Sequence, residues 1–302
     1  MLVDEALAAL AIDAGGYYVD ATFGRGGHTA RILEALGGEG RVLAIDRDPQ
    51  AIEAGRRRFA DDVRIAFVHA PFSQLGAQVS EHGEGRPCRG VLFDLGVSSP
   101  QLDSPERGFS FRADGPLDMR MDPTHGQPVS AWLARAGVDE IREVIASLGE
   151  ERFARRVADA IVTARREKPI ERTTELAAIV SRAVRTREPG KHPATRTFQA
   201  LRMFVNDELG EIARGLEAAA DALTIGGRLV VISFHSLEDR VVKQFIKRES
   251  TVDPALARLP VIPQSAEPRL KSVGRKTRPA DSEVGANPRA RSALLRVAEK
   301  IA

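Results

Sequence analysis

The stretch from Tyr17 to Thr29, YYVDATFGRGGHT, decides the fold of this chain. Its apolar start, Tyr17–Asp20, predicts a short buried strand, and the glycines at 24, 26 and 27 predict a tight turn that leads into a helix. Such a turn places backbone N–H groups and a helix N-terminus at the carboxyl edge of a sheet, where nucleotide-like cofactors bind. We therefore expect a cofactor site at this turn.

A second apolar run, Arg41–Asp46, ends in a carboxylate at the spacing typical of sites that bind ribose hydroxyl groups. A dinucleotide site would carry a third glycine five residues after Gly24, where this chain has Thr29. Asp20, just before the turn, would repel a pyrophosphate but could accept hydrogen bonds from the ammonium group of S-adenosylmethionine. The pattern favours a methyltransferase over the alternative, an NAD-dependent dehydrogenase.

Short apolar runs recur along the chain and alternate with helical stretches. The predicted strands are Tyr17–Asp20, Arg41–Asp46, Val63–His69, Gly90–Leu95, Arg228–Phe234 and Ser292–Val297. This alternation predicts an α/β fold with a doubly wound, mostly parallel sheet. Roughly 130 residues separate the fourth and fifth runs, whereas a crossover needs about 10–12. We therefore expect a methyltransferase domain over residues 1–105 and 195–302, interrupted by a helical substrate-recognition subdomain over residues 106–194.

Helical periodicity within and after the insertion predicts helices over Glu150–Arg166 and Thr174–Arg187. A break is expected at Glu188–Pro193, followed by one long helix with apolar residues from Phe198 to Ile212 on one face. The glycine pair at 226 and 227 is expected to end that helix before the fifth strand. The proline-rich segment Val252–Asn287 predicts a mobile loop.

Composition restricts the class of protein. Hydrophobic residues make up 43% and charged residues 28% of the 302 residues, typical of a folded soluble domain. We expect no signal peptide, and no run of this sequence approaches the ~18 apolar residues that a membrane span needs. Cys88 is the only cysteine, which excludes a disulfide framework and favours the reducing cytoplasm. The six histidines show no zinc spacing, and we expect no metal.

Charge is unevenly distributed, although the net charge is only +2. Residues 151–202 carry 13 Lys or Arg against 6 Asp or Glu, and residues 267–300 carry 9 against 4. Such patches can bind a phosphate backbone, or they can be solvated helix faces. Charge alone leaves both interpretations open.

Polar or aromatic residues follow three further strands at the edge where active sites of open α/β sheets lie. Phe72 could lie on an adenine ring or pack in the core. Asp94 ends the fourth strand, and a charge there is costly to bury without a task. Phe234 and His235 follow the fifth strand, where Ser236 or Asp239 could serve as a helix cap.

Eight blocks of this sequence resemble the ribosomal RNA small subunit methyltransferase H family. They are DATFGRGGH at 20–28, AIDRD at 44–48, DLGVSSPQLD at 94–103, RGFSF at 107–111, GPLDMRMD at 115–122, HPATRTFQA at 192–200, SFHSLEDR at 233–240 and NPRARS at 287–292. The blocks span nearly the whole chain in family order. The resemblance implies a class I, Rossmann-like methyltransferase fold with an inserted helical domain. It also implies S-adenosylmethionine-dependent methylation of the exocyclic N4 of cytidine 1402 in 16S ribosomal RNA.

The resemblance also implies which residues bind the cofactor. By position, the family's contacts fall on Gly26, Gly27, His28, Asp46, Phe72, Asp94 and Gln101, and Gly24 belongs to the same turn. Family members usually carry a short His-x-Pro-Val segment ahead of the residues that Leu2–Glu5 resembles. This chain begins almost at that point, so we expect the arm to be absent or omitted by a late start codon.

Cytosine N4 is a poor nucleophile because its lone pair is delocalised into the ring, so alignment with the methyl donor is the main task. Alignment can supply roughly 7–11 kcal/mol of the barrier. We expect Asp94, or backbone carbonyls of residues 94–99, to accept the amine hydrogens while a water takes the proton. A pure cofactor-binding role for Asp94 is the alternative. Methylation at carbon 5 would need a cysteine nucleophile, and Cys88 lies at the opposite edge of the sheet.

The substrate base must be presented outside a stack, with its phosphates held by basic groups. We expect the 151–202 face, including Arg185 and Arg187, and the segment from Arg269 to Arg291 to hold them. Further candidate substrate contacts are Ser98, Ser99, Phe234 and His235. Other functions left open are another nucleic-acid amino-methyltransferase and an inactive RNA-binding scaffold. The oligomeric state, monomer or homodimer, is also open.

Overall fold

The computed structural model describes residues 1–184, 192–252 and 267–302, which form two compact units. Unit 1 comprises Met1–Gly96 and Leu209–Ala302, and unit 2 comprises Val97–Glu208. The sequence predicts the insertion at 106–194, inside the 97–208 span of unit 2.

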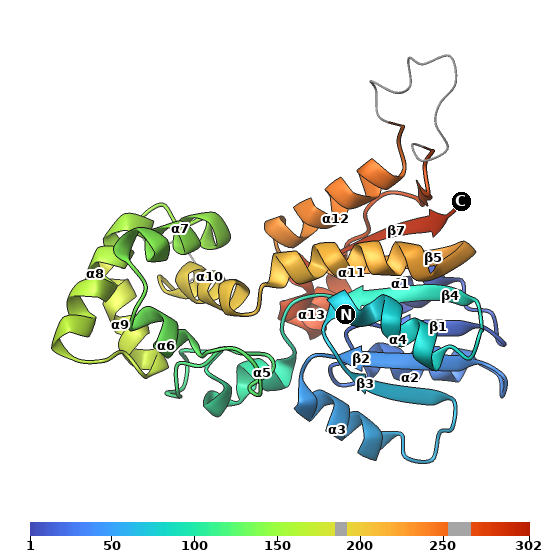
Figure 1. Ribbon diagram of the computed structural model, residues 1–302, viewed down its shortest axis with the longest axis horizontal. Helices are drawn as coiled ribbons and strands as arrows, with labels where there is room; N and C mark the ends of the chain where they lie inside the picture. The colour runs from blue at the N-terminus through green and yellow to red at the C-terminus, as the bar shows by residue number, and fades with distance from the viewer. Residues whose placement is uncertain (185–191, 253–266) are drawn as a thin grey trace. The chain divides into compact units, whose positions relative to one another are not determined.

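Unit 1 is built on a seven-stranded sheet with the order β3-β2-β1-β4-β5-β7-β6 (Figure 1). The strands are β1 Tyr17–Asp20, β2 Arg41–Asp46, β3 Ile65–His69, β4 Cys88–Asp94, β5 Leu223–Ser233, β6 Leu270–Ser272 and β7 Leu294–Lys300. The first five are parallel, and β7 is antiparallel to both β5 and β6. The predicted doubly wound, mostly parallel sheet is confirmed. Its order reverses between β1 and β4, at the position where open α/β sheets bind ligands.

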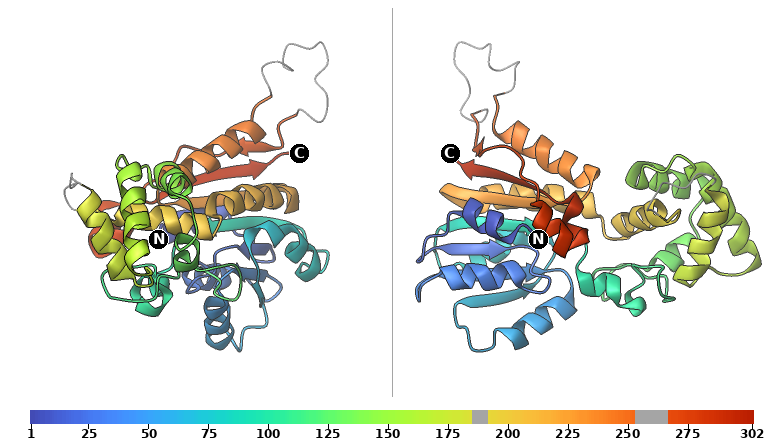
Figure 2. Two further views of the ribbon diagram at one scale, coloured as in Figure 1. Left: turned by 60° about the vertical axis from the view of Figure 1, so that its left-hand side comes forward. Right: turned by 180° about the vertical axis from the view of Figure 1, so that it is seen from behind.

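Helices cover both faces of this sheet, which explains why its strands are continuously apolar. They are α1 Val3–Leu10, α2 Gly27–Ala35, α3 Pro49–Arg58, η1 Phe72–Gln74, α4 Leu75–His82, α11 Glu208–Ala222, α12 Ser236–Glu249, α13 Asp281–Ala286 and η5 Pro288–Ser292. Adjacent strand residues point to opposite faces. Val19 packs in the core under α4, α11 and α12, whereas Tyr18 packs in the core under α1 and α2, the face seen from behind in Figure 2.

Unit 2 is helical and has a core of its own. Its elements are α5 Ser99–Asp103, η2 Pro105–Arg107, α6 Val129–Leu133, α7 Val138–Gly149, α8 Ala154–Glu167, α9 Thr173–Ala183 and α10 Thr195–Val205. Ile145 of α7, Ile161 of α8 and Leu201 of α10 are fully buried in this core. Their three-to-four spacing with other apolar residues is the pattern of helices that bury one face.

Two expectations about helix ends are wrong. The long helix expected through Ile212 is divided into α10 and α11, because Asp207 has a left-handed backbone with φ 45°. The side chain of the preceding residue, Asn206, binds backbone groups of residues 119–121, which fixes the chain at this break. The helix that follows ends at Ala222, and Gly226, with φ 81°, lies inside β5 at an irregularity in its pairing with β4.

The loop expected over Val252–Asn287 is also partly wrong, because β6 and α13 lie within it. A three-residue strand is too short to show a period in the sequence, and β6 exists because its backbone pairs with β7. The rest of this expectation, over residues 253–266, lies outside the described residues. Among the helices of the described ranges, none has the length and apolar character that crossing a bilayer requires.

Candidate cofactor site at the carboxyl edge of the sheet

The turn between β1 and α2 depends on glycine for its shape. Gly24 and Gly26 have φ of 53° and 70°, in the left-handed region that side chains with a Cβ avoid. A Cβ on Gly26 would lie 2.6 Å from the ring of Phe23, whereas one on Gly27 would meet no atom within 4 Å. Gly27 is the exposed first residue of α2. The turn therefore has no room for a side chain at Gly26, whereas it has room for one at Gly27.

Asp46, at the end of β2, joins this turn. Its Oδ2 accepts the N–H of Gly24 at 2.7 Å, and its Oδ1 accepts the N–H of Asp48 at 2.8 Å. Burial raises the pKa of Asp46 to about 6, although these two N–H groups favour the ionised form. Each carboxylate oxygen can accept a second hydrogen bond. The structure thus brings Gly24 and Asp46 together and leaves the carboxylate able to accept further hydroxyl donors.

Asp20, at the end of β1, is directed into its own turn. Its side chain accepts the Thr29 hydroxyl at 2.6 Å and the Thr22 N–H at 3.1 Å, and the residue is 1% exposed. Burial raises the pKa of its carboxyl group. Thr22 and Thr29 each use one acceptor position of this carboxylate, and a contact between Asp20 and a cofactor ammonium group stays a prediction. These two threonines hold the turn, and sequence reasoning gave them no role.

Asp94 ends β4, the strand beside β1. Its N–H donates to the Thr22 hydroxyl at 2.6 Å, and its Oδ2 lies 3.6 Å from Nδ1 of His28. Its Oδ1 is buried and has no hydrogen-bond partner among the described residues. Burial raises the pKa of Asp94 to about 6, against the opposing effect of His28. A buried acceptor without a donor destabilises a fold, so this oxygen is a candidate contact for a ligand.

His28 lies between Asp94 and the start of the chain and is 6% exposed. Its Nε2 is 3.0 Å from the carbonyl oxygen of Met1. Because a carbonyl oxygen only accepts, this nitrogen carries a proton. Burial lowers the pKa of His28, against the opposing effect of Asp94. Nearby, the Leu2 N–H donates to Glu283 of α13 at 2.8 Å, so the N-terminus lies beside α13 (Figure 1).

Three carboxylates therefore end the neighbouring strands β1, β2 and β4, and we call Asp20, Asp46 and Asp94 the carboxylate edge. The charge of Asp20 adds to the effect of burial in raising the pKa of both Asp46 and Asp94. Such an edge attracts a cation and repels a pyrophosphate.

Phe72 lies beyond β3, in η1. Its ring is half-buried and meets Phe93 edge-on with 5.3 Å between ring centroids. This contact fixes one edge of the ring against the core. At the opposite edge of the sheet, Cys88 begins β4 and is buried, which raises the pKa of its thiol to about 12. A thiol in that state is not a nucleophile.

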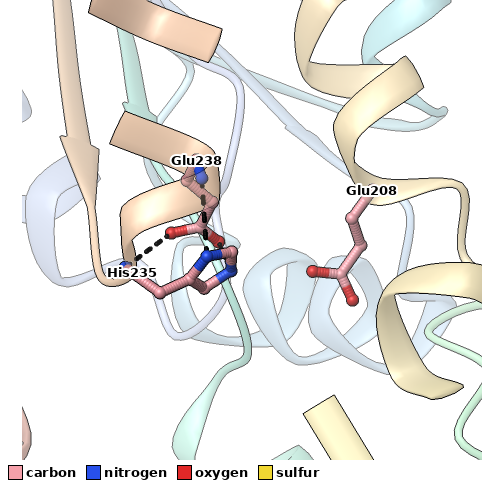
Figure 3. Close-up of side chains that lie close together, drawn as sticks. All are labelled: Glu208, His235 and Glu238. Carbon is pink, nitrogen blue, oxygen red and sulfur yellow. Dashed lines mark hydrogen bonds and ion pairs between the residues drawn. The ribbon is translucent and has the colours of Figure 1, made fainter. Parts of the chain in front are cut away.

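Phe234 and His235 connect β5 to α12 in the sequence. His235 directly precedes the first residue of α12 (Figure 3). The N-cap is His235, not Ser236 or Asp239, since its Nδ1 accepts the Glu238 N–H at 3.4 Å. Glu238 is fully buried, accepts the N–H of Phe234 at 2.7 Å, and lies 3.0 Å from Nε2 of His235. Sequence reasoning missed Glu238, although an acidic residue three positions after a cap is the signal of a capping box.

The remaining predicted residues lie in unit 2 or outside the described residues, and their roles stay predictions. Ser98, Ser99 and Gln101 belong to unit 2, where Oε1 of Gln101 accepts the N–H of Ser98 at 2.9 Å at the start of α5. Arg185 and Arg187 lie outside the described residues.

Comparisons with known proteins give a consistent result. A model of the MraW methylase family matches residues 1–301. A ribosomal RNA small subunit methyltransferase H from Dechloromonas aromatica is 55% identical over 302 residues, covering 100% of this chain and 97% of the relative. Proteins of the same name from Thioalkalivibrio sulfidiphilus and Alteromonas mediterranea are 53% and 51% identical, each covering 100% of this chain and 96% of the relative. The resemblance inferred from the sequence blocks is confirmed.

Proposed function

This chain belongs to the MraW methylase family and is a methyltransferase, and from that premise we propose that it methylates the exocyclic N4 of cytidine 1402 in 16S ribosomal RNA, with S-adenosylmethionine as donor. The observation that carries the choice of cofactor is the carboxylate edge. Its charge suits a sulfonium cation, and it disfavours the pyrophosphate of a dinucleotide. The names of the relatives support the choice of substrate.

The residues present fit S-adenosylmethionine. Bound there, this cofactor would supply a methyl group that is already strongly electrophilic. Asp46 has acceptor capacity left on both oxygens for the two ribose hydroxyl groups, while Gly24 fixes its orientation. The open space at Gly27 admits a ligand close to the backbone of α2. Phe72, which is half-buried, offers an aromatic ring for the adenine.

Asp94 is the residue we propose for the amine. Its Oδ1 has no donor among the described residues, so it can accept a hydrogen of the cytosine amino group and favour the tetrahedral nitrogen of the transition state. The other oxygen, Oδ2, lies 3.6 Å from Nδ1 of His28, which helps to position the carboxylate. Backbone carbonyls of residues 94–99 remain the alternative acceptors, and a water takes the final proton.

Two other candidates explain the structure less well. A dehydrogenase lacks its third glycine and would set a pyrophosphate against the carboxylate edge. An inactive scaffold would have no use for a buried acceptor without a donor at Asp94. We also propose the cytoplasm as the compartment, since Cys88 is the only cysteine and the substrate RNA is ribosomal.

Methyl transfer to small-subunit RNA that lacks the modification tests the proposal. We expect labelled methyl from S-adenosylmethionine to appear on N4 of cytidine 1402, mapped by mass spectrometry of RNA fragments. Asp46→Asn should raise the KM for S-adenosylmethionine by about 10- to 100-fold, since hydrogen bonds to a charged group contribute about 1.5–3 kcal/mol. Asp62→Asn, which removes a carboxylate bound only by Arg64, is the matched control. Methyl transfer to another atom, or none, contradicts the proposal.

A further inference from the structure

The outward face of α12 carries lysines and no acidic side chain. Lys243 and Lys247 are four residues apart, so they lie on the same side of the helix, and both are exposed. The opposite side, with Val242, Phe245 and Ile246, is buried against the sheet. The acidic residues of α12 are used elsewhere, for example Asp239, which binds Arg296 through two hydrogen bonds of 2.7 and 3.0 Å.

A second row of cations lies beside α12, on the edge of the sheet. Beyond β6, the chain continues along β7, where the Val273 N–H donates to Val297 and Thr277 pairs with Leu295. This edge segment contains no acidic residue and exposes Lys271, Arg275, Lys276 and Arg278. Helix α12 packs on both β6 and β7 (Figure 1). Arg296 chiefly, and then Lys276 and Lys243, lower the pKa of Asp239, so the two rows lie within range of one carboxylate.

The two lysines of α12 and the four cations of the edge segment differ from the neighbouring Arg269 in their ion pairing. Arg269, expected to bind phosphate, is instead held by Glu217, Asp221 and Glu249 at 2.6–3.0 Å. Within the described ranges, none of the six is within ion-pair distance of a carboxylate. Their charge is therefore available to an anionic partner.

We infer that these residues form one surface that binds the phosphate backbone of the RNA substrate. The six members of this surface, which we call the lysine ridge, are Lys243, Lys247, Lys271, Arg275, Lys276 and Arg278. The inference rests on the proposed function and adds a place in unit 1 where RNA binds outside the reacting base. Helix α12 begins directly after His235 at the carboxyl edge and extends for about 21 Å. An RNA strand bound along this helix would therefore extend towards Asp94 with the base to be methylated.

The composition of the ridge identifies RNA as its partner. Four of the seven lysines in the chain belong to it. Lysine binds phosphate as a point charge without reading sequence, which suits a positioning contact. The exposed large apolar residues among those described are Val63, Phe204, Ile225 and Ile301. None of them lies in α12 or in the segment 271–278 that carries the ridge. Proteins that bind a membrane surface usually insert apolar side chains as well. A membrane surface is therefore the less favoured partner.

The salt dependence of RNA binding tests the ridge. We expect Lys243→Gln/Lys247→Gln/Lys276→Gln to reduce the slope of log affinity against log salt by about 2, since each phosphate contact to a single strand contributes about 0.7. The KM for unmodified small-subunit RNA should rise while the KM for S-adenosylmethionine stays unchanged. Arg57→Gln, which removes a cation paired with Glu53, is the control. Unchanged melting temperatures verify folding.

Amine labelling of the wild-type protein gives a second, mutation-free measurement. RNA should protect the four ridge lysines several-fold relative to labelling without RNA. An unchanged salt slope in a variant that still methylates RNA overturns the ridge and leaves the proposed function intact. Absence of methylation by the wild-type protein contradicts the proposed function instead. Binding to vesicles of anionic phospholipid without binding to RNA also overturns the inference.

Discussion

At the scale of single residues, Asp94 is the carboxylate of the site on which unfavourable electrostatic interactions converge. It is a buried carboxylate with one oxygen lacking a donor among the described residues, and its other oxygen lies 3.6 Å from Nδ1 of His28. Asp20 and Glu238 add negative charge to its surroundings, while His28 and the terminal amino group oppose them. Groups that a ligand must satisfy commonly reduce the stability of the free protein.

A carboxyl group with a raised pKa makes stability depend on pH in a fixed direction. The pKa of Asp94 is about 6 in the folded protein and 3.8 in an unfolded chain, so the folded state binds the proton more tightly. The stability it contributes is present below pH 3.8 and is lost as pH rises through 6. Asp94→Asn should therefore stabilise the ligand-free protein above pH 6, by up to about 3 kcal/mol, and change it little near pH 4. Urea unfolding at pH 4 and pH 7.5 measures this.

Asp62 provides a control of opposite sign. The hydrogen bonds from Arg64 lower the pKa of Asp62, so its contribution is present at neutral pH and lost in acid. Asp62→Asn should destabilise the protein at pH 7.5 and have less effect at low pH. If Asp94→Asn behaves like Asp62→Asn, the burial argument for Asp94 is wrong.

At the scale of elements, the turn between β1 and α2 offers two adjacent glycines with different tasks. Gly26→Ala places a Cβ 2.6 Å from Phe23 at a positive φ, so it should lower both stability and S-adenosylmethionine affinity. Gly27→Ala enters open space at the first residue of a helix and should raise stability by up to about 1 kcal/mol. Its methyl group should nevertheless weaken cofactor binding. Melting temperature and calorimetric titration separate the two effects, and equal stability losses would contradict this account.

The break between α10 and α11 depends on Asn206. Its amide group donates to the carbonyls of Met119 and Arg202 at 2.7 and 2.8 Å and accepts the Met121 N–H at 2.8 Å, at 2% exposure. Asn206→Ala leaves these buried backbone groups without partners, which should cost about 2–4 kcal/mol of stability in unit 2. Gln199→Ala on the same helix removes only a weak contact to a methionine sulfur and should have little effect. Thermal unfolding followed by circular dichroism compares them.

Elements whose stability comes from local pattern were predictable, and those that depend on distant partners were not. Tyr17–Asp20 and Arg41–Asp46 match β1 and β2 at both ends, because strands buried on both faces are apolar throughout. Conversely, β6 forms only where β7 supplies hydrogen bonds, and the α10–α11 break is set by backbone groups some 85 residues away. The same division applies to the site. Asp46 and Asp94 stand out as charges that end strands, whereas the enclosure of Asp20 by Thr29 depends on how the turn folds.

At the scale of the whole molecule, the two units have separate cores. Every member of the unit 2 core lies between Phe109 and Leu201, and the cores on the two faces of the sheet draw only on unit 1. Elements that bury apolar surface against one another unfold together. Two separate cores therefore favour two separate unfolding transitions. The residues proposed for the cofactor, apart from Gln101, lie in unit 1.

Calorimetry of the full chain should therefore resolve two transitions, of which S-adenosylmethionine shifts one. A ligand at 100 times its Kd adds about 2.7 kcal/mol to the state that binds it. For a unit of this size, that corresponds to an increase of roughly 5–10 °C in melting temperature. Asn206→Ala should lower the other transition and leave the shift unchanged, because Asn206 belongs to unit 2. A single transition that moves as a whole with the cofactor would show that the two cores unfold together, and the separation argued from their membership would then be wrong.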